Sequence, residues 1–144
     1  MTFINTKSNS LPKEYKTSEE ERIRCRESMS RYLGTYKGRL SNICKNIKER
    51  SELKGLEFDL DRPFLYALYE NQSGRCAISG IEFDLVNNKG RVPFSISVDR
   101  IDSNKGYIKS NVRLVCSMAN FAKNIWTDHD LHLFCKKVVE HGDL

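Results

Sequence analysis

The stretch "SVDRIDSNKGYIKSNVRLVCSMANFAKN", from Ser97 to Asn124, contains the residue types from which a metal-dependent reaction centre can be built. Asp99 follows an alternating apolar segment, and Asn120 lies in a helical segment downstream. A carboxylate and an amide oxygen, with water completing the shell, suit a hard cation such as Mg²⁺. Such an ion can polarise a phosphate and steady a departing oxygen, so this pair points to phosphodiester hydrolysis.

Further polar side chains of the same stretch are candidates for this site. Asn124 lies one helical turn after Asn120, so we expect both on one helix face. Lys123 and Arg113 could bind phosphate without reading base sequence. Taken singly, Asp99 and Asn120 could equally be a strand-end acid and a helix amide that only face solvent. Their joint spacing favours a shared site.

The elements that position these residues follow from periodicity and turn signals. The segment "FSISV" (94–98) alternates as a strand does, which places Asp99 on the polar face at the strand end. A turn-rich connection covers 102–111, followed by the strand "VRLVC" and a helix from about Ser117. We expect this strand, loop, strand and helix to form a compact ββα unit in which Asp99 and Asn120 are neighbours.

The rest of the chain predicts an α+β fold whose N-terminal part is helical. Helices are expected at 19–34, at 35–50 with an apolar stripe, and from Arg62 after a capping Asp61. "RCAISGIEFDL" (75–85) predicts a small hairpin, and "NNKGRVP" (87–93) predicts a loop. The expected organisation is a flexible leader at 1–18 and a single domain at 19–144, made of basic helices (19–72), the ββα core (75–126) and a C-terminal helix (127–142).

Positive charge is concentrated in one segment. The chain has a net charge of +5, and residues 22–54 carry ten cations against three acids, so the remainder is slightly acidic. A basic segment of this kind predicts binding to a polyanion, because cations placed on phosphates release condensed counterions. A solvated helix face is the alternative. The cations expected to contact DNA are Lys37, Arg39, Lys45, Lys48, Lys105, Arg113 and Lys123.

Composition excludes several other classes of protein. With 144 residues, of which 39% are hydrophobic, and no long apolar run, the chain predicts one globular unit and no membrane span. The N-terminal stretch lacks the apolar segment of a secretory signal, so we expect a cytoplasmic protein. The five cysteines include no CxxC pair, which argues against a disulfide framework.

The quoted stretch resembles the HNH, or ββα-metal, endonuclease family, notably its phage-encoded members and the PacI-type restriction endonucleases. The resemblance runs from Cys76 to Trp126 and rests on the motifs "VDR", "GY", "NVRLVC" and "N" of "SMANFAKN". It implies that Asp99 and Asn120 bind Mg²⁺, with Mn²⁺ or Ni²⁺ as substitutes, and that Asn111 braces the long loop. Gly106 and Tyr107 would be turn and packing residues.

Two positions depart from the family pattern. Arg100 stands where most relatives have a histidine general base, and a guanidinium stays protonated at any workable pH. Arg100 would instead hold the phosphate, which leaves proton removal to water, a metal-bound hydroxide or another side chain. Asn124 and Asp102 are accessory candidates, and His129 and His132 are weaker ones for the base.

The second departure concerns zinc. Many relatives hold the ββα unit with two CxxC pairs, whereas here Ser79 follows Cys76 and Ala119 follows Cys116 at the matching positions. Two thiolates make a poor structural zinc site, so none is expected.

The resemblance and the charge pattern together predict a metal-dependent endonuclease acting on duplex DNA. One small chain with one site nicks one strand, so cutting both strands needs a homodimer or two successive events by a monomer. A homing endonuclease is an alternative to a restriction enzyme, and a phage-encoded protein would act in the host cytoplasm. A non-cutting DNA-binding protein that retains the scaffold is the alternative from a different class.

Overall fold

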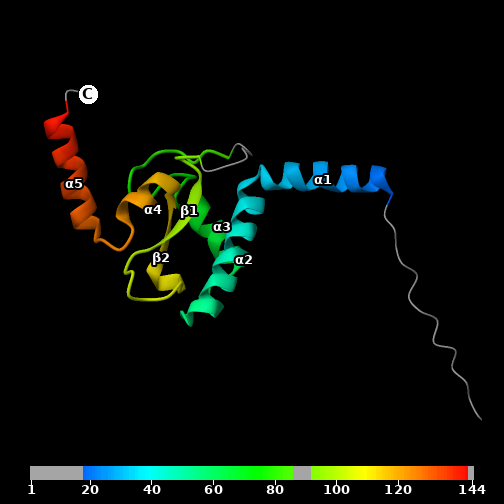
Figure 1. Ribbon diagram of the computed structural model, residues 1–144, viewed down its shortest axis with the longest axis horizontal. Helices are drawn as coiled ribbons and strands as arrows, with labels where there is room; N and C mark the ends of the chain where they lie inside the picture. The colour runs from blue at the N-terminus through cyan, green and yellow to red at the C-terminus, as the bar shows by residue number, and fades with distance from the viewer. Residues whose placement is uncertain (1–17, 86–91, 143–144) are drawn as a thin grey trace, which may run out of the picture.

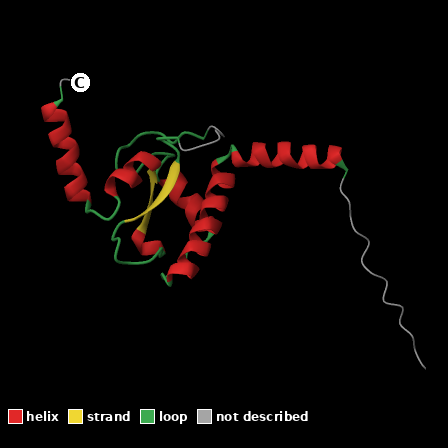
Figure 2. Ribbon diagram, viewed as in Figure 1, coloured by secondary structure: helices red, strands yellow, loops and turns green. Residues whose placement is uncertain are grey.

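The computed structural model describes residues 18–85 and 92–142, which adopt a mixed α+β fold. Within these ranges the chain forms five α-helices, one 3-10 turn and a two-stranded antiparallel sheet (Figures 1 and 2). The α+β class with a helical N-terminal part is confirmed. The predicted leader, apart from Ser18, and most of the predicted loop at 87–93 lie outside the described residues.

The N-terminal helices begin and end at local sequence signals. α1 (Glu19–Leu33) begins with a capping box, in which the Ser18 hydroxyl and the Glu21 carboxylate each accept the other residue's amide hydrogen. α1 buries none of its residues and extends away from the rest of the molecule (Figure 1). α2 (Tyr36–Lys54) continues past the predicted end at residue 50. It ends at Gly55, whose φ of 62° few other residues adopt easily.

The core lies between α2, α3 (Arg62–Asn71) and the sheet. α3 begins as predicted, with the Asp61 carboxylate accepting from the Phe64 amide. The core side chains that are at most 1% exposed include Leu40 and Ile47 of the predicted α2 stripe and Leu65 of α3. They pack against the sheet residues Leu114 and Val115. This packing fixes α2 against the part of the chain that carries the predicted site.

The sheet pairs β1 (Ile96–Arg100) with β2 (Val112–Cys116), with Asp99 opposite Arg113. β1 begins later than predicted because the Ser95 amide donates to the Val92 carbonyl in a turn. Asp99 is only 3% exposed. The predicted polar face at this strand end is therefore buried, because Arg113 and Lys123 of α4 cover the carboxylate.

The predicted hairpin at 75–85 forms as a short antiparallel turn in which an isolated bridge joins Arg75 to Glu82 and no regular strands develop. It turns at Gly80, with a φ of 71°, and the Cys76 amide donates to the Ile81 carbonyl. Its backbone also bonds to β2, because the Ala77 amide donates to the Leu114 carbonyl at 3.0 Å. The Gln72 side chain also bonds to both the amide and the carbonyl of Leu114. The outer edge of β2 is therefore satisfied at its centre.

Two helices follow the sheet. α4 (Ser117–Lys123) ends at Asn124, whose φ is 47°. α5 (Asp128–His141) begins with the predicted cap, in which Thr127 and Asp130 bond reciprocally. α5 projects from the body on the side opposite α1 (Figure 1). None of the described helices has the length and apolar character needed to cross a membrane.

A close backbone contact joins the end of α2 to the loop between the strands. The Tyr107 amide donates to the Glu57 carbonyl at 2.9 Å, and the Asp59 amide donates to the Tyr107 carbonyl at 3.2 Å. A Cβ added at Gly106 would lie 2.2 Å from the Glu57 carbonyl oxygen, so only glycine permits this approach. Lys109 reinforces the junction from the same loop, because its amide donates to the Asp59 carboxylate at 2.7 Å.

Candidate active site

A pocket of about 380 Å³ lies between β1, α4 and the C-terminal part of α2. It brings together four of the predicted site residues, which are Asp99, Arg100, Asn120 and Asn124. Ser97, Ser103, Ser117, Tyr107 and Arg50 add polar groups to its wall. The other candidates of the stretch do not line it; they are Asp102, Lys105, Asn111, Arg113 and Lys123.

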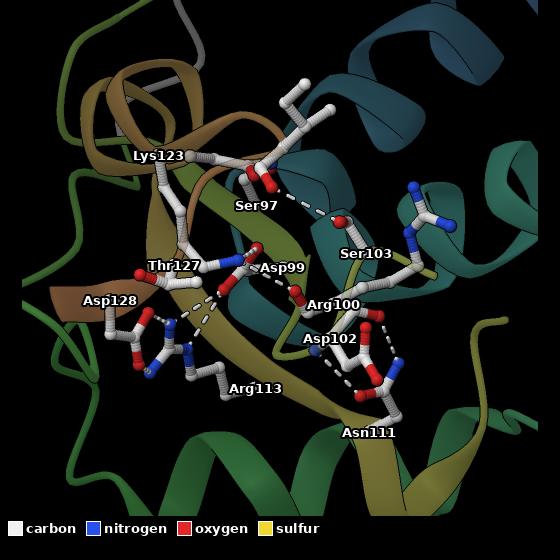
Figure 3. Close-up of polar contacts among 12 residues, drawn as sticks. Ser97, Asp99, Arg100, Asp102, Ser103, Asn111, Arg113, Lys123, Thr127 and Asp128 are labelled. Carbon is white, nitrogen blue, oxygen red and sulfur yellow. Dashed lines mark hydrogen bonds and ion pairs between the residues drawn. The ribbon is translucent and has the colours of Figure 1, made fainter. Parts of the chain in front are cut away.

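Asp99 is held by two cations (Figure 3). Its Oδ2 accepts from Nε and Nη2 of Arg113 at 3.0 and 2.9 Å, and its Oδ1 accepts from Nζ of Lys123 at 3.2 Å. The Asp99 and Lys123 side chains are 3% and 0% exposed, so these interactions take place away from water. Asp99 is therefore an electrostatically neutralised carboxylate at the pocket wall.

Arg113 links Asp99 to the first turn of α5. Its guanidinium also donates to both carboxylate oxygens of Asp128. Burial alone would lower the pKa of Arg113, but the hydrogen bonds to Asp128 and Asp99 outweigh it and raise that pKa. The same contact lowers the pKa of Asp128, so both groups stay charged at neutral pH. Arg113 thus serves the fold, and its predicted phosphate contact competes with two carboxylates.

Lys123 does not lie where a phosphate contact requires it. Its side chain is fully buried, and Nζ donates to the Arg100 carbonyl at 2.9 Å as well as to Asp99. A buried ammonium with these partners cannot reach a DNA backbone in this conformation. The sequence suggested an exposed helix cation, and packing of α4 against β1 turns it inward.

Asn120 reaches the same pocket from α4. Its side-chain NH₂ donates to the Ser97 hydroxyl at 2.7 Å. This bond leaves the amide oxygen of Asn120 available as a donor atom for a metal or a substrate. The predicted neighbours Asp99 and Asn120 therefore do share one pocket, although they come from different elements.

Asn111 ties the loop between the strands to its own base. Its Oδ1 accepts from the Asp102 amide at 2.9 Å, and its Nδ2 donates to the carbonyls of Asp102 and Gly106 at 3.0 and 3.1 Å. The residue is 5% exposed. These contacts are those of a loop brace, and none of them uses Asn111 for chemistry.

Asn111→Ala is expected to loosen this loop. Loss of three hydrogen bonds at this buried side chain should lower the free energy of unfolding by about 1–3 kcal/mol. Hydrogen exchange at the Asp102 amide should accelerate while exchange in α2 changes little. Unchanged protection of the Asp102 amide would show that the brace is dispensable. Asn104→Ala, an exposed change in the same loop, is the control.

Arg100 lies at the pocket with part of its hydrogen-bonding capacity unused. Nη1 donates to the Lys105 carbonyl at 2.9 Å, and the guanidinium lies 5.1 Å from the centre of the Tyr107 ring. A stacked guanidinium keeps its edge free for an anion. Arg100 is therefore oriented by the braced loop.

Asp102 behaves as a turn residue. Its carboxylate accepts from the Asn104 amide at 2.9 Å, and that bond lowers its pKa. Lys105 lies 3.8 Å from the same carboxylate. Asp102 does not line the pocket, so it takes no direct part there in this conformation, whereas Asn124 does line it.

The α2 cations differ in their surroundings. Arg39 donates to the Leu85 carbonyl at 3.1 Å, which makes it part of the fold. Lys37 lies 5.8 and 5.7 Å from the centres of the Tyr36 and Tyr66 rings. Lys45 pairs loosely with Glu49 at 3.9 Å, and Lys48 is exposed. The three lysines, unlike Arg39, present their charges to solvent.

Sequence reasoning placed Arg50 only among the basic residues of the second helix, and the structure places it at the pocket. Arg50 lies about 50 positions before Asp99 in the chain, and no local pattern connects the two. Only the packing of α2 on the sheet and the Glu57–Tyr107 junction bring it there. Tyr107, expected as a packing residue, also lines the pocket.

The donor set fits a hard cation. Asp99 and Asn120 offer a carboxylate and an amide oxygen to one pocket, and Oδ1 of Asp99, which accepts only from Lys123, has a second lone pair. Among the described residues no three His, Cys, Asp or Glu side chains gather as a metal-binding group. A centre of one carboxylate and one amide does not need such a group.

The cysteine positions do not fit structural zinc. Cys76 and Cys116 are each 2% exposed. Burial raises the pKa of Cys116, and the neighbouring Cys76 adds to this effect. Burial also opposes ionisation of Cys76, but hydrogen bonds led by that of Ser79 lower its pKa overall. The two thiols and Ser79 therefore lie together, and a hydroxyl and the alanine at position 119 replace two of the four thiolates that zinc would need.

The two histidine candidates lie elsewhere. His132 lines a different, largely apolar pocket of about 570 Å³ beside Cys116 and Cys135, and His129 is exposed on α5. Neither lines the pocket that contains Asp99.

Comparison of the chain with protein-family models, with curated proteins and with solved structures found no match. Function is therefore argued from the residues and their geometry.

Proposed function

We propose that the chain is a metal-dependent DNA endonuclease of the HNH, or ββα-metal, type. One observation carries the proposal: Asp99, Arg100 and Asn120, which the sequence resemblance assigns to the reaction centre, line the same pocket. The order β1, β2, α4 and the loop braced by Asn111 are consistent with that scaffold.

Asp99 and Asn120 would hold Mg²⁺, or Mn²⁺ or Ni²⁺ in its place. When bound, the ion would supply positive charge to the scissile phosphate and to the departing 3′ oxygen. Arg100, stacked on Tyr107, would hold a non-bridging phosphate oxygen. None of the described residues that line the pocket is a histidine, so the proton of the attacking water would pass to solvent.

The substrate proposed is double-stranded DNA in the cytoplasm, which would be a host cytoplasm if the gene belongs to a phage. The exposed lysines Lys37, Lys45 and Lys48 would contact the sugar–phosphate backbone, which positions a duplex without reading its sequence. A monomer with one such site would nick, and a homodimer would cut both strands. A map of cleavage sites would separate restriction from homing, because homing sites are long.

The test is relaxation of supercoiled plasmid in Mg²⁺, Mn²⁺ and Ni²⁺ by the wild-type chain and by Asn120→Ala. This substitution removes a proposed ligand and only one hydrogen bond of the fold, that to Ser97. We expect metal-dependent nicking that falls at least about a hundredfold in Asn120→Ala. Asn71→Ala, at the exposed end of α3, is the matched control and should retain full activity. Equal cleavage by both variants would contradict the proposed site.

A non-cutting DNA-binding protein is the second candidate, and the pairing of Asp99 favours it. Both carboxylate oxygens already accept hydrogen bonds from cations, and Arg100 occupies the position of the base. DNA binding that weakens with salt, without nicking in any of the three metals, would establish this alternative.

A further inference from the structure

We propose that Arg50 and Arg100 form a phosphate subsite in the pocket that binds a DNA phosphate without any metal ion. The proposal rests on the proposed function for the identity of the polyanion, and it adds Arg50, which no sequence motif assigns to the site. Arg50 comes from the last turns of α2, and Arg100 comes from the end of β1.

The charge around the pocket is the first argument. Three charged residues line it, which are Arg50, Asp99 and Arg100. Arg113 and Lys123 already neutralise Asp99 from behind. The two arginines are therefore not balanced by the only carboxylate on the wall, and the pocket attracts an anion in the absence of a metal ion.

The availability of the two guanidinium groups is the second argument. Arg50 is exposed, and no hydrogen bond or ion pair engages it within the described part of the chain. Arg100 donates one N–H to the Lys105 carbonyl, and its guanidinium group stacks on the Tyr107 ring. Guanidinium groups bind phosphate oxygens in pairs of parallel hydrogen bonds, which an ammonium cannot imitate.

The rigidity of the subsite is the third argument. The backbone bonds between Glu57 and Tyr107 fix the end of α2 to the loop that orients Arg100. The Ser97 hydroxyl lines the same pocket, accepts from Asn120 and can still donate its own hydrogen to a phosphate oxygen. The backbone segments that carry the two arginines are therefore held at one pocket of about 380 Å³.

Fluorescence anisotropy of a labelled 20-base-pair DNA duplex in EDTA tests the subsite. Arg50→Ala should weaken DNA binding about tenfold. Arg50→Lys should recover only part of the lost affinity, because lysine restores the positive charge but not the paired hydrogen bonds of a guanidinium group. Lys54→Ala is the matched control, since Lys54 is an exposed cation of α2 that neither lines the pocket nor belongs to the proposed DNA contacts. It should weaken binding less than about twofold.

A double-mutant cycle makes the test specific to a shared phosphate. If both arginines hold one phosphate, Arg50→Ala with Arg100→Ala should weaken binding by less than the product of the two single effects. Equal losses in Arg50→Ala and Lys54→Ala, or independent effects of the two arginines, would overturn the subsite. Melting temperatures equal to wild type should accompany Arg50→Ala, because the residue is exposed.

The outcome is separable from that of the proposed function. Arg50-dependent binding in EDTA without nicking in any metal supports the subsite and rejects the nuclease. Metal-dependent nicking together with unchanged DNA binding by Arg50→Ala supports the nuclease and rejects the subsite.

Discussion

Replacement of Asp99 by alanine is expected to lower the free energy of unfolding by about 3–5 kcal/mol, the largest effect of any single polar substitution proposed for this chain. The carboxylate is the shared partner of Arg113 and Lys123, whose side chains are 16% and 0% exposed. Its removal leaves a buried ammonium and a largely buried guanidinium without that partner. Domains of this size are stable by only about 5–15 kcal/mol, so the variant should unfold at much lower denaturant concentration.

The comparison that isolates this effect is Asp128→Ala. Asp128 accepts hydrogen bonds from the same guanidinium, but its side chain is 50% exposed. Exposed ion pairs contribute about 1 kcal/mol or less, so urea denaturation should show only a small loss. Similar losses in the free energy of unfolding for Asp99→Ala and Asp128→Ala would mean that burial of the Asp99 ion pairs does not increase their contribution to stability. The expected instability also makes Asn120→Ala a cleaner test of catalysis than Asp99→Ala.

Gly106→Ala is the second large expected effect, with a loss of about 1–3 kcal/mol. The new Cβ would lie 2.2 Å from the Glu57 carbonyl oxygen and 2.8 Å from its carbon, so a backbone segment must move. Movement there separates the end of α2 from the loop. Hydrogen exchange should accelerate at the Tyr107 amide, which donates to Glu57.

Gly34→Ala provides the matched control for Gly106→Ala. Gly34 has a φ of −73°, and its added Cβ would approach no atom more closely than 3.3 Å. This variant should have nearly wild-type stability in the same thermal unfolding experiment. If Gly106→Ala has the same melting temperature as Gly34→Ala, the backbone contact between Glu57 and Tyr107 accommodates the new Cβ without loss of stability.

Features encoded within a few residues were predictable from the sequence. The starts of the helices that follow Asp61 and Thr127 were predicted because capping residues mark them, and the apolar stripe of α2 reports its buried face. The strand at 112–116 is a short run of apolar and β-branched residues. The turn at 75–85 was predictable in the same way, but its bonds to β2 and to Gln72 were not. The partner in β2 is distant in sequence and leaves no local signal.

Some features of the candidate site were also predictable from the local sequence, whereas others depend on tertiary packing. The proximity of Asp99 and Asn120 was predictable because one short ββα segment contains both residues. The inward direction of Lys123 depends on how α4 packs on β1, and the arrival of Arg50 depends on the tertiary position of α2. Helical spacing also predicted Asn124 beside Asn120, and both residues line the pocket although the helix ends at Asn124 with a positive φ. Local patterns identified the reactive groups but not their electrostatic neighbours.

The Gln72 side chain has a consequence for how copies of this protein can associate. Its amide imitates a strand backbone, donating to the Leu114 carbonyl and accepting from the Leu114 amide at 2.8 and 3.0 Å. Unpaired strand edges are templates on which a second chain can add its own strand, a route both to dimers and to aggregates. At the middle of β2 that template is already occupied by Gln72, the residue that follows α3. Addition of a strand from a second molecule is therefore blocked at this point of the β2 edge.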